Sequence, residues 1–228
     1  MTARRSLRTV PDMPPLDAFG PSIAIGLILV VMLWFALGTQ RNIRKGNELL
    51  RWLQGGLPII GRRTTMRWLG SSVVELGIVE PEAPIREATV LIVLEPRDVP
   101  VLWAFARSRG RRDFLIVRAN LVRSPGFSMD VRDPHGWTGR PDEPDPDDHR
   151  QARDWPGGCV ALVGQGADEP AIREAWGRLG KATDDVWRLA VQPIVPHLEV
   201  HFRPAASGST AEGALAPIRD LAATLARH

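Results

Sequence analysis

The chain has 228 residues, with 29 basic and 26 acidic side chains, a formal net charge of +3, one cysteine and no tyrosine. At roughly 100–200 residues per domain, this length fits one domain, or a small domain with an appendage. A single cysteine excludes an intramolecular disulfide framework and a cysteine-rich zinc module. The 44% hydrophobic content argues against wholesale disorder, and so small a net charge gives no reason to expect nucleic acid as a partner.

Residues 19–38 form the most apolar segment and read FGPSIAIGLILVVMLWFALG, without a charged side chain. A helix needs about 20 apolar residues to cross a bilayer core of roughly 30 Å, and a domain of this size has little volume to bury such a helix on every side. The segment is longer than the apolar region of a signal peptide, about 7–15 residues, and no small-x-small cleavage site follows it. We therefore predict an uncleaved transmembrane helix, preceded by an extramembrane tail over residues 1–18.

Basic residues flank this segment and indicate its orientation. Lys and Arg close to a span favour the cytoplasmic side, and they begin nearer to the span on its C-terminal side. We expect the N-terminus outside and the C-terminal domain in the cytoplasm, at an inner or plasma membrane. The flanking residues are Arg4, Arg5 and Arg8 on the N-terminal side, and Arg41, Arg44, Lys45 and Arg51 on the C-terminal side.

Residues 39–56 are predicted to form a basic juxtamembrane helix that ends at Gly55 and Gly56. Two interpretations stay open. The segment either binds anionic lipid, at about 1 kcal/mol per basic residue, or is a solvated connector whose charges only set the topology. Tryptophan rings accumulate among lipid headgroups, so two of them are included in the predicted membrane surface. The residues assigned to this surface are Trp34, Arg41, Arg44, Lys45, Arg51 and Trp52.

The remaining segment, residues 57–228, is predicted to be an α+β domain with a mixed or antiparallel sheet and about three helices. Short β-branched runs predict the strands, and an Asp followed by Pro twice predicts a helix start. The predicted strands are 64–69, 72–79, 88–94, 113–122, 127–131, 159–163, 186–194 and 198–202. The predicted helices are 98–110, with Val101, Leu102, Phe105 and Ala106 on one apolar face, 168–180, and 209–228.

The order strand, helix, strand, strand occurs twice, first in residues 88–132 and again in residues 159–228. Either the domain contains a duplicated β-α-β-β unit, or the recurrence is chance, since strand–helix–strand order is common. Residues 133–158 join the two halves as an acidic loop. Its stretch RPDEPDPDDHR, residues 140–150, has three prolines and five acidic residues in eleven and is too polar to order itself by burial, so we expect it to be exposed and mobile.

His197, Glu199 and His201 alternate with apolar residues, so in a strand they share one face. Two histidines and a carboxylate are metal-ligand types, which makes these three residues our metal candidates. The first and last Cα atoms of such a set lie about 13 Å apart, however, too far for one ion to reach all three side chains. The competing interpretation is an exposed strand face with polar residues outward.

Other chemical motifs are incomplete. The Gly164-Gln165-Gly166 turn lacks the third glycine of a dinucleotide fingerprint, and the acidic loop lacks the ligand spacing of a calcium site. The chain has no G-x-S-x-G, P-loop or H-E-x-x-H sequence. Cys159 opens an apolar strand, which favours a buried, inert thiol. We expect no cofactor and no resident metal.

These observations favour a non-enzymatic interaction or scaffold domain, anchored in a bilayer by one helix, with a membrane protein or a second copy as partner. One alternative is a membrane-associated enzyme with an unrecognised active site, for which Asp113, His197, Glu199 and His201 are candidates. The other is a sensor of anionic lipid or a small ligand, working through the basic half of the chain. The sequence does not identify a substrate.

Overall fold

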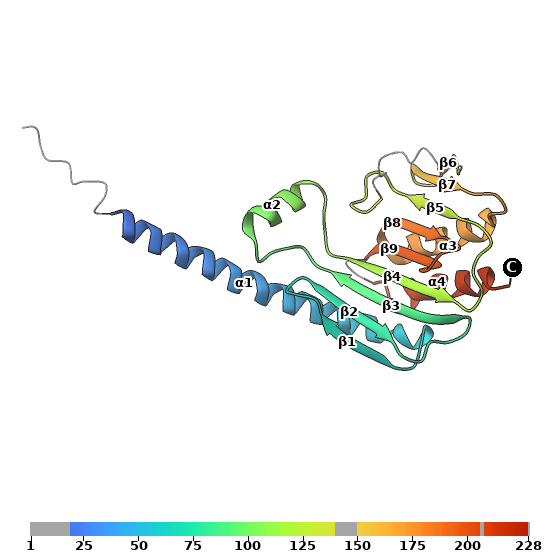
Figure 1. The fold of residues 1–228 in the computed structure, drawn as a ribbon, viewed down its shortest axis with the longest axis horizontal. Coiled ribbons are helices and arrows are strands. Elements are labelled where there is room, and N and C mark those ends of the chain that lie inside the picture. Colours follow the sequence, from blue (N-terminus) through green and yellow to red (C-terminus); the bar gives the residue numbers. More distant parts are fainter. Residues whose placement is uncertain (1–18, 140–149, 206–207, 228) are drawn as a thin grey trace, which may run out of the picture.

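The computed structural model describes residues 19–139, 150–205 and 208–227. The fold is α+β: one long N-terminal helix projects from a domain built on a nine-stranded antiparallel sheet, with helices packed mainly on one face (Figure 1). This is the fold class predicted from the sequence. Residues 1–18 and 140–149, which include the predicted tail and ten residues of the predicted acidic loop, lie outside the described residues.

Helix α1 (Gly20–Gln54) is one continuous element of 35 residues, so the predicted transmembrane and juxtamembrane segments are a single helix. Residues 19–37 are exposed throughout, although almost all of them are apolar. From residue 38 onward one side of α1 is buried in the domain. The buried positions recur every three or four residues, which places them on one helix face; they are Gly38, Asn42, Gly46, Leu49 and Leu53.

Every pairing between neighbouring strands of the sheet is antiparallel. The order from one edge to the other is β1-β2-β3-β4-β9-β8-β5-β7-β6. In chain order the strands are β1 (Thr64–Trp68), β2 (Val73–Ile78), β3 (Ile85–Val93), β4 (Phe114–Leu121), β5 (Met129–Arg132), β6 (Gln151–Trp155), β7 (Cys159–Val163), β8 (Thr183–Val191) and β9 (Leu198–Pro204).

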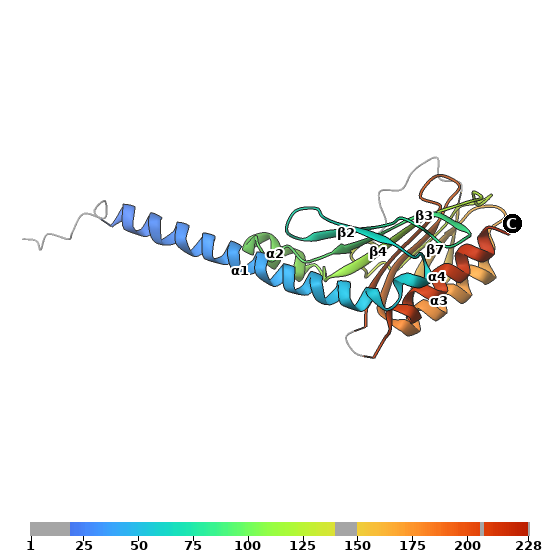
Figure 2. The same ribbon diagram turned by 90° about the horizontal axis from the view of Figure 1, so that it is seen from below.

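The main core lies on the face of the sheet that is covered by the second half of α1 and two further helices (Figure 2). These are α3 (Glu169–Ala182) and α4 (Ala211–Leu225), preceded along the chain by the short helix η2 (Leu57–Ile59). Alternation along β9 sends Leu198, Val200 and Phe202 into this core, all fully buried. The opposite face carries a smaller cluster of Phe114, Ile116 and Trp187. Helix α2 (Pro100–Ser108) lies apart from both, beside α1 (Figure 1).

The predicted order β-α-β-β is present twice, as β3-α2-β4-β5 and β7-α3-β8-β9, but the two units are built differently. Strands β3 and β4 are direct neighbours, whereas β5 lies between β7 and β8. Helix α3 therefore crosses over a strand and packs on the sheet, while α2 joins two adjacent strands from beyond the end of the sheet. The shared order does not produce a shared arrangement.

The structure corrects the predicted loop over residues 133–158, because β6 forms within it and pairs with β7 at the sheet edge. The residues of this strand carry little pattern from which it could be predicted. Four of its five residues are exposed, and only Trp155 is buried. An edge strand whose side chains are mostly polar and solvated lacks the apolar alternation by which strands are recognised.

Candidate functional site

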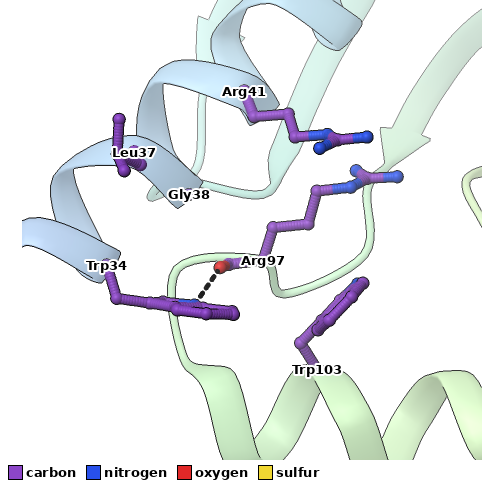
Figure 3. A pocket seen from close by; sticks show the side chains of 6 residues that line it. All are labelled: Trp34, Leu37, Gly38, Arg41, Arg97 and Trp103. Atoms are coloured by element: carbon purple, nitrogen blue, oxygen red, sulfur yellow. Dashed lines mark hydrogen bonds between the residues drawn. The ribbon is translucent and has the colours of Figure 1, made fainter. Parts of the chain in front are cut away.

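The most distinctive site lies where α1 leaves the domain, between residues 34–41 of α1 and the loop that leads into α2. The indole Nε1 of Trp34 donates a hydrogen bond to the carbonyl oxygen of Arg97 at 3.0 Å, and the rings of Trp34 and Trp103 lie 6.3 Å apart. Between them is an open cavity of about 240 Å³ (Figure 3). Its lining residues are Trp34, Leu37, Gly38, Arg41, Arg97 and Trp103.

Gly38 permits this close contact between α1 and the loop. A Cβ atom at residue 38 would lie 2.3 Å from the carbonyl oxygen of Arg97 and 2.6 Å from the Cα of Asp98. Both are backbone atoms, so a side chain here would force the helix and the loop apart. The glycine therefore fixes how α1 and the root of α2 are placed against each other.

A buried carboxylate holds the root of α2. The side chain of Glu95 is almost fully buried, accepts a hydrogen bond from Trp103 Nε1 at 2.6 Å and pairs with Arg107 at 3.2 Å. Both partners lie on α2. The helix is thus attached to the domain by charge-assisted hydrogen bonds, which need polar partners that are well placed.

A second polar contact joins α1 to the same loop. Arg97 forms a two-pronged ion pair with Asp113, with both N–O distances 2.9 Å, and also donates to Oδ1 of Asn42 at 3.0 Å. The amide nitrogen of Asn42 donates to the carbonyl oxygen of Glu95 at 3.1 Å. Asn42 is fully buried, and both its amide nitrogen and its carbonyl oxygen bind this loop. The pKa of nearby Arg111 is lowered by burial, against the opposing charges of Glu95 and Asp113.

The predicted membrane-surface residues divide into two groups. Arg41 and Arg44 are exposed on α1 just past its apolar half. Further along α1, Lys45 pairs with Glu48 at 3.0 Å, and Arg51 donates to a backbone carbonyl one turn earlier.

The two tryptophans of the predicted surface also differ in their surroundings. Trp34 lies at the end of the exposed apolar half of α1. Trp52 packs against the main core and donates to the carbonyl oxygen of Ser209 at 2.9 Å. At 1.5 Å per residue, it lies about 27 Å along the helix from Trp34. The structure therefore places Trp52 in the packing of the domain, away from the position we expected for it.

Helix α2 exposes most of the apolar face predicted for residues 98–110. Of its residues only Ala106 is buried, whereas Val101, Leu102 and Phe105 are 80%, 48% and 51% exposed. The guanidinium group of Arg109 lies 4.4 Å from the centre of the Phe105 ring. The predicted apolar face is therefore divided, because Ala106 is buried while the other three residues are exposed.

The structure separates the residues that we considered as metal or catalytic candidates. His197 precedes β9 and accepts a hydrogen bond from the backbone N–H of Leu121 at 2.9 Å. Glu199 and His201 do lie together, with Oε1 and Nε2 2.8 Å apart. Asp113 lies just before β4, at the end of that strand away from His197, and forms an ion pair with Arg97. Within residues 19–139, 150–205 and 208–227, no three His, Cys, Asp or Glu side chains are grouped so as to hold a metal ion.

Glu199 belongs to a row of ion pairs that crosses the sheet on the face opposite the main core. Burial by itself would raise the pKa of Glu199, but the hydrogen bond and charge of His201, followed by those of Arg118, outweigh it and lower the pKa to about 2. Each carboxylate of the row thus has at least two basic partners. The row runs Arg118–Glu199–Arg188–Asp130–Arg132, with N–O distances from 2.6 to 3.4 Å.

Sequence reasoning did not single out Asp130 or Arg188, because each stands alone in an apolar strand with no motif around it. The outward positions of neighbouring strands meet only once the register is known. Cys159 is buried, as we expected, and burial, together with the charge of Asp133, raises its thiol pKa to about 11. Its surroundings therefore disfavour the reactive thiolate.

Comparison of the chain with protein-family models and with curated proteins finds no match.

Proposed function

We propose that the chain is a single-pass membrane protein that holds its α+β domain at the cytoplasmic surface of an inner or plasma membrane, where the domain serves as a non-enzymatic interaction or scaffold module. The observation that carries this proposal is the division of α1. Its first half is apolar and exposed, and its second half is built into the domain core.

An exposed apolar helix surface of this length is unfavourable in water, because contiguous apolar patches larger than a few hundred Å² are rare on soluble monomers. The 35-residue helix contains a window apolar enough to cross a bilayer, and about 20 residues suffice for the crossing. The cations just beyond it, Arg41 and Arg44, support a cytoplasmic domain by the positive-inside rule.

Two observations support the interaction role: the pairing of carboxylates with arginines, and an open strand edge. The carboxylates of Glu95, Asp130 and Glu199 are each bound by arginines of the same chain, an arrangement that stabilises structure. In contrast, the edge strand β1 exposes four of its five residues and has a strand neighbour on one side only. An open strand edge is a suitable place for a partner segment to add by backbone hydrogen bonds.

The anchor is tested by alkaline carbonate extraction of membranes that contain the full chain. The wild type should stay with the membrane pellet. The double variant Leu29→Arg/Val30→Arg should be released, because each arginine near the bilayer centre costs about 2.5–3.5 kcal/mol. Ile194→Arg, which alters an equally exposed apolar residue in the domain, should behave like the wild type. Release of the wild-type chain would refute the anchor.

The orientation is tested with a membrane-impermeant maleimide and a Thr65→Cys variant in sealed, right-side-out vesicles. Thr65 is exposed on β1, and the buried Cys159 should contribute little background. We expect labelling only after detergent is added. Labelling of intact vesicles would place the domain outside.

The scaffold role is tested by a photo-crosslinking side chain at position 65, with the same side chain at exposed position 174 on α3, away from both sheet edges, as the control. A discrete adduct at position 65, identified by mass as a second copy or a membrane protein, would support the proposal. Equal adducts at both positions, or none in native membranes, would contradict it.

A further inference from the structure

Helix α2 is inverted relative to a surface helix of a soluble protein. The outward face of such a helix is normally polar, but that of α2 carries Val101, Leu102 and Phe105, all exposed. Its inward face carries the side chains that bind Glu95. The polar side of the helix thus faces the domain, and the apolar side faces outward.

Helix α2 lies beside the end of the exposed apolar half of α1, so whatever covers that half can also cover the apolar face of α2. In Figure 1, α2 is the part of the domain that reaches farthest toward the N-terminal end of α1, and Trp103 contacts Trp34. Trp34 lies four residues before Gly38, where the burial of α1 begins, a distance of about 6 Å along the axis. Interfacial helices lie about 5–10 Å into the boundary between headgroups and acyl chains, so α2 fits this depth if the boundary lies near Gly38.

The residues that line the cavity between α1 and α2 change from aromatic to basic along α1, from its apolar half toward the domain. Trp34 lines its end nearer the apolar half of α1, and Arg41 lies seven residues, about 10 Å, farther toward the domain. Figure 3 shows the side chains of Arg41 and Arg97 extending away from the Trp34 ring. A phospholipid presents its glycerol region at the interface and its phosphate just outside it. The indole ring of Trp34 and then the cation of Arg41 follow one another along α1 in the matching order.

Within the described part of the chain, the cavity offers an anion one cation, Arg41. Glu95 and Asp113 are held by Arg97 and Arg107, and Asp98 accepts a hydrogen bond from Ser71 at 2.5 Å. The exposed guanidinium of Arg41 has no ion-pair partner among the residues that the structure describes. Further basic side chains nearby along the chain are Arg44, Arg107, Arg109, Arg111 and Arg112.

We propose that α2 and the cavity between α1 and α2 form a binding site for an anionic phospholipid of the bilayer that α1 enters. The apolar face of α2 lies among the upper acyl chains, and the lipid phosphate lies beside Arg41. This inference rests on the proposed anchoring by α1, and it adds a second, lipid-specific contact to that anchor.

Depth measurements on the full chain in phosphatidylcholine/phosphatidylglycerol nanodiscs separate the two proposals. Nitroxide labels are placed one at a time by Val30→Cys in the span, Phe105→Cys on α2, and Ile194→Cys, a residue 73% exposed at the opposite end of the sheet. We expect the labels at 30 and 105 to be more accessible to oxygen than to a water-soluble nickel reagent, and the label at 194 to show the reverse.

A water-exposed label at 105 with a bilayer-buried label at 30 would overturn the lipid site and leave the anchor standing. Water exposure at both positions would overturn both proposals. Burial of position 105 that appears only when two chains share a disc would assign the apolar face to a second copy, and would also overturn the lipid site.

The headgroup contact is tested by native mass spectrometry of the chain released from discs with equal amounts of the two lipids. The wild type should retain phosphatidylglycerol in preference to phosphatidylcholine, and Arg41→Gln should reduce that preference roughly fivefold, as expected for one interfacial charge. Arg63→Gln, which removes an exposed arginine from the loop before β1, should leave it unchanged. Equal retention of both lipids by the wild type, or displacement of lipid by millimolar inorganic phosphate, would contradict a site for a bilayer lipid.

Discussion

The two β-α-β-β units have the same order of elements but use their helices in opposite ways. Helix α3 buries Ile172, Ala175, Trp176 and Leu179 against the sheet and turns its charged side outward. Helix α2 buries only Ala106 and turns its apolar side outward. The difference follows from the connections, since α3 crosses over β5 and must lie on the sheet, whereas α2 joins adjacent strands and is free to lie beside α1. An amphipathic pattern therefore identifies an apolar face, but it does not tell whether that face packs against the domain or points away from it.

The largest expected effect is in the unit with the packed helix. Leu179 is 1% exposed, so Leu179→Ala should lower the free energy of unfolding by about 2–5 kcal/mol, as measured by urea unfolding of the full chain in detergent. The same change on the other helix, Leu102→Ala, should cost less than about 1 kcal/mol. Similar losses for the two variants would break the comparison.

The next effect concerns the contact that holds the root of α2. Asn42→Leu keeps the size of the side chain but leaves Arg97 and the carbonyl of Glu95 without their buried partner. We expect a loss of about 1–3 kcal/mol in the free energy of unfolding. Asn47→Leu, at an exposed position of the same helix, is the matched control and should change stability little. An unchanged Asn42→Leu protein would show that the hydrogen bonds of Asn42 contribute nothing to the stability of this contact.

The third effect concerns the ion-pair row that joins the two units. The pKa of Glu199 is lowered from 4.5 to about 2, so its contribution to stability is complete above about pH 4.5 and is lost as the pH falls toward 2. Glu199→Gln should therefore be about 1–2 kcal/mol less stable at neutral pH, allowing for partial screening by solvent, with the difference shrinking below pH 4.5. A difference independent of pH would mean that the charge of Glu199 contributes nothing.

The smallest expected effect is again on α2. Phe105→Ser removes half-exposed apolar surface and one stacking contact with Arg109, so the free energy of unfolding in detergent should change by less than about 1 kcal/mol. A larger loss would show that Phe105 packs within the domain, and the contrast with α3 would then be weaker than the exposed fractions indicate.

Much of the fold was predictable because its signals are local. The apolar segment of α1 is uninterrupted, the β-branched runs predicted eight of the strands, and Asp168 caps α3 as expected. Strand β6 was missed because its side chains are mostly polar and exposed. Helix α4 begins at Ala211, two residues after the predicted start at residue 209. Thr210 caps it, and Pro217 lies inside it.

The candidate site was less predictable because it depends on long-range contacts. Asn42, Glu95 and Asp113 come from three separate parts of the chain, and each looks ordinary in its own segment. Gly38 reads as one more small residue of an apolar run until the loop at Arg97 is seen against it. The His197-Glu199-His201 pattern illustrates the reverse case, since a clear local alternation ends in two residues that meet and one that does not.

Because α1 is continuous, it couples movement of its exposed half to movement of the domain. The helix has no break between the exposed apolar half and the half that is built into the core, so rotation or tilt of the exposed half is passed directly to the sheet. The embedded part, residues 38–54, is about 24 Å long at 1.5 Å per residue. A change of tilt by about 10° would swing its far end by about 4 Å. In a chain anchored by α1 as we propose, a thinner or thicker membrane that changes the helix tilt would therefore alter the height at which the domain presents its open edge.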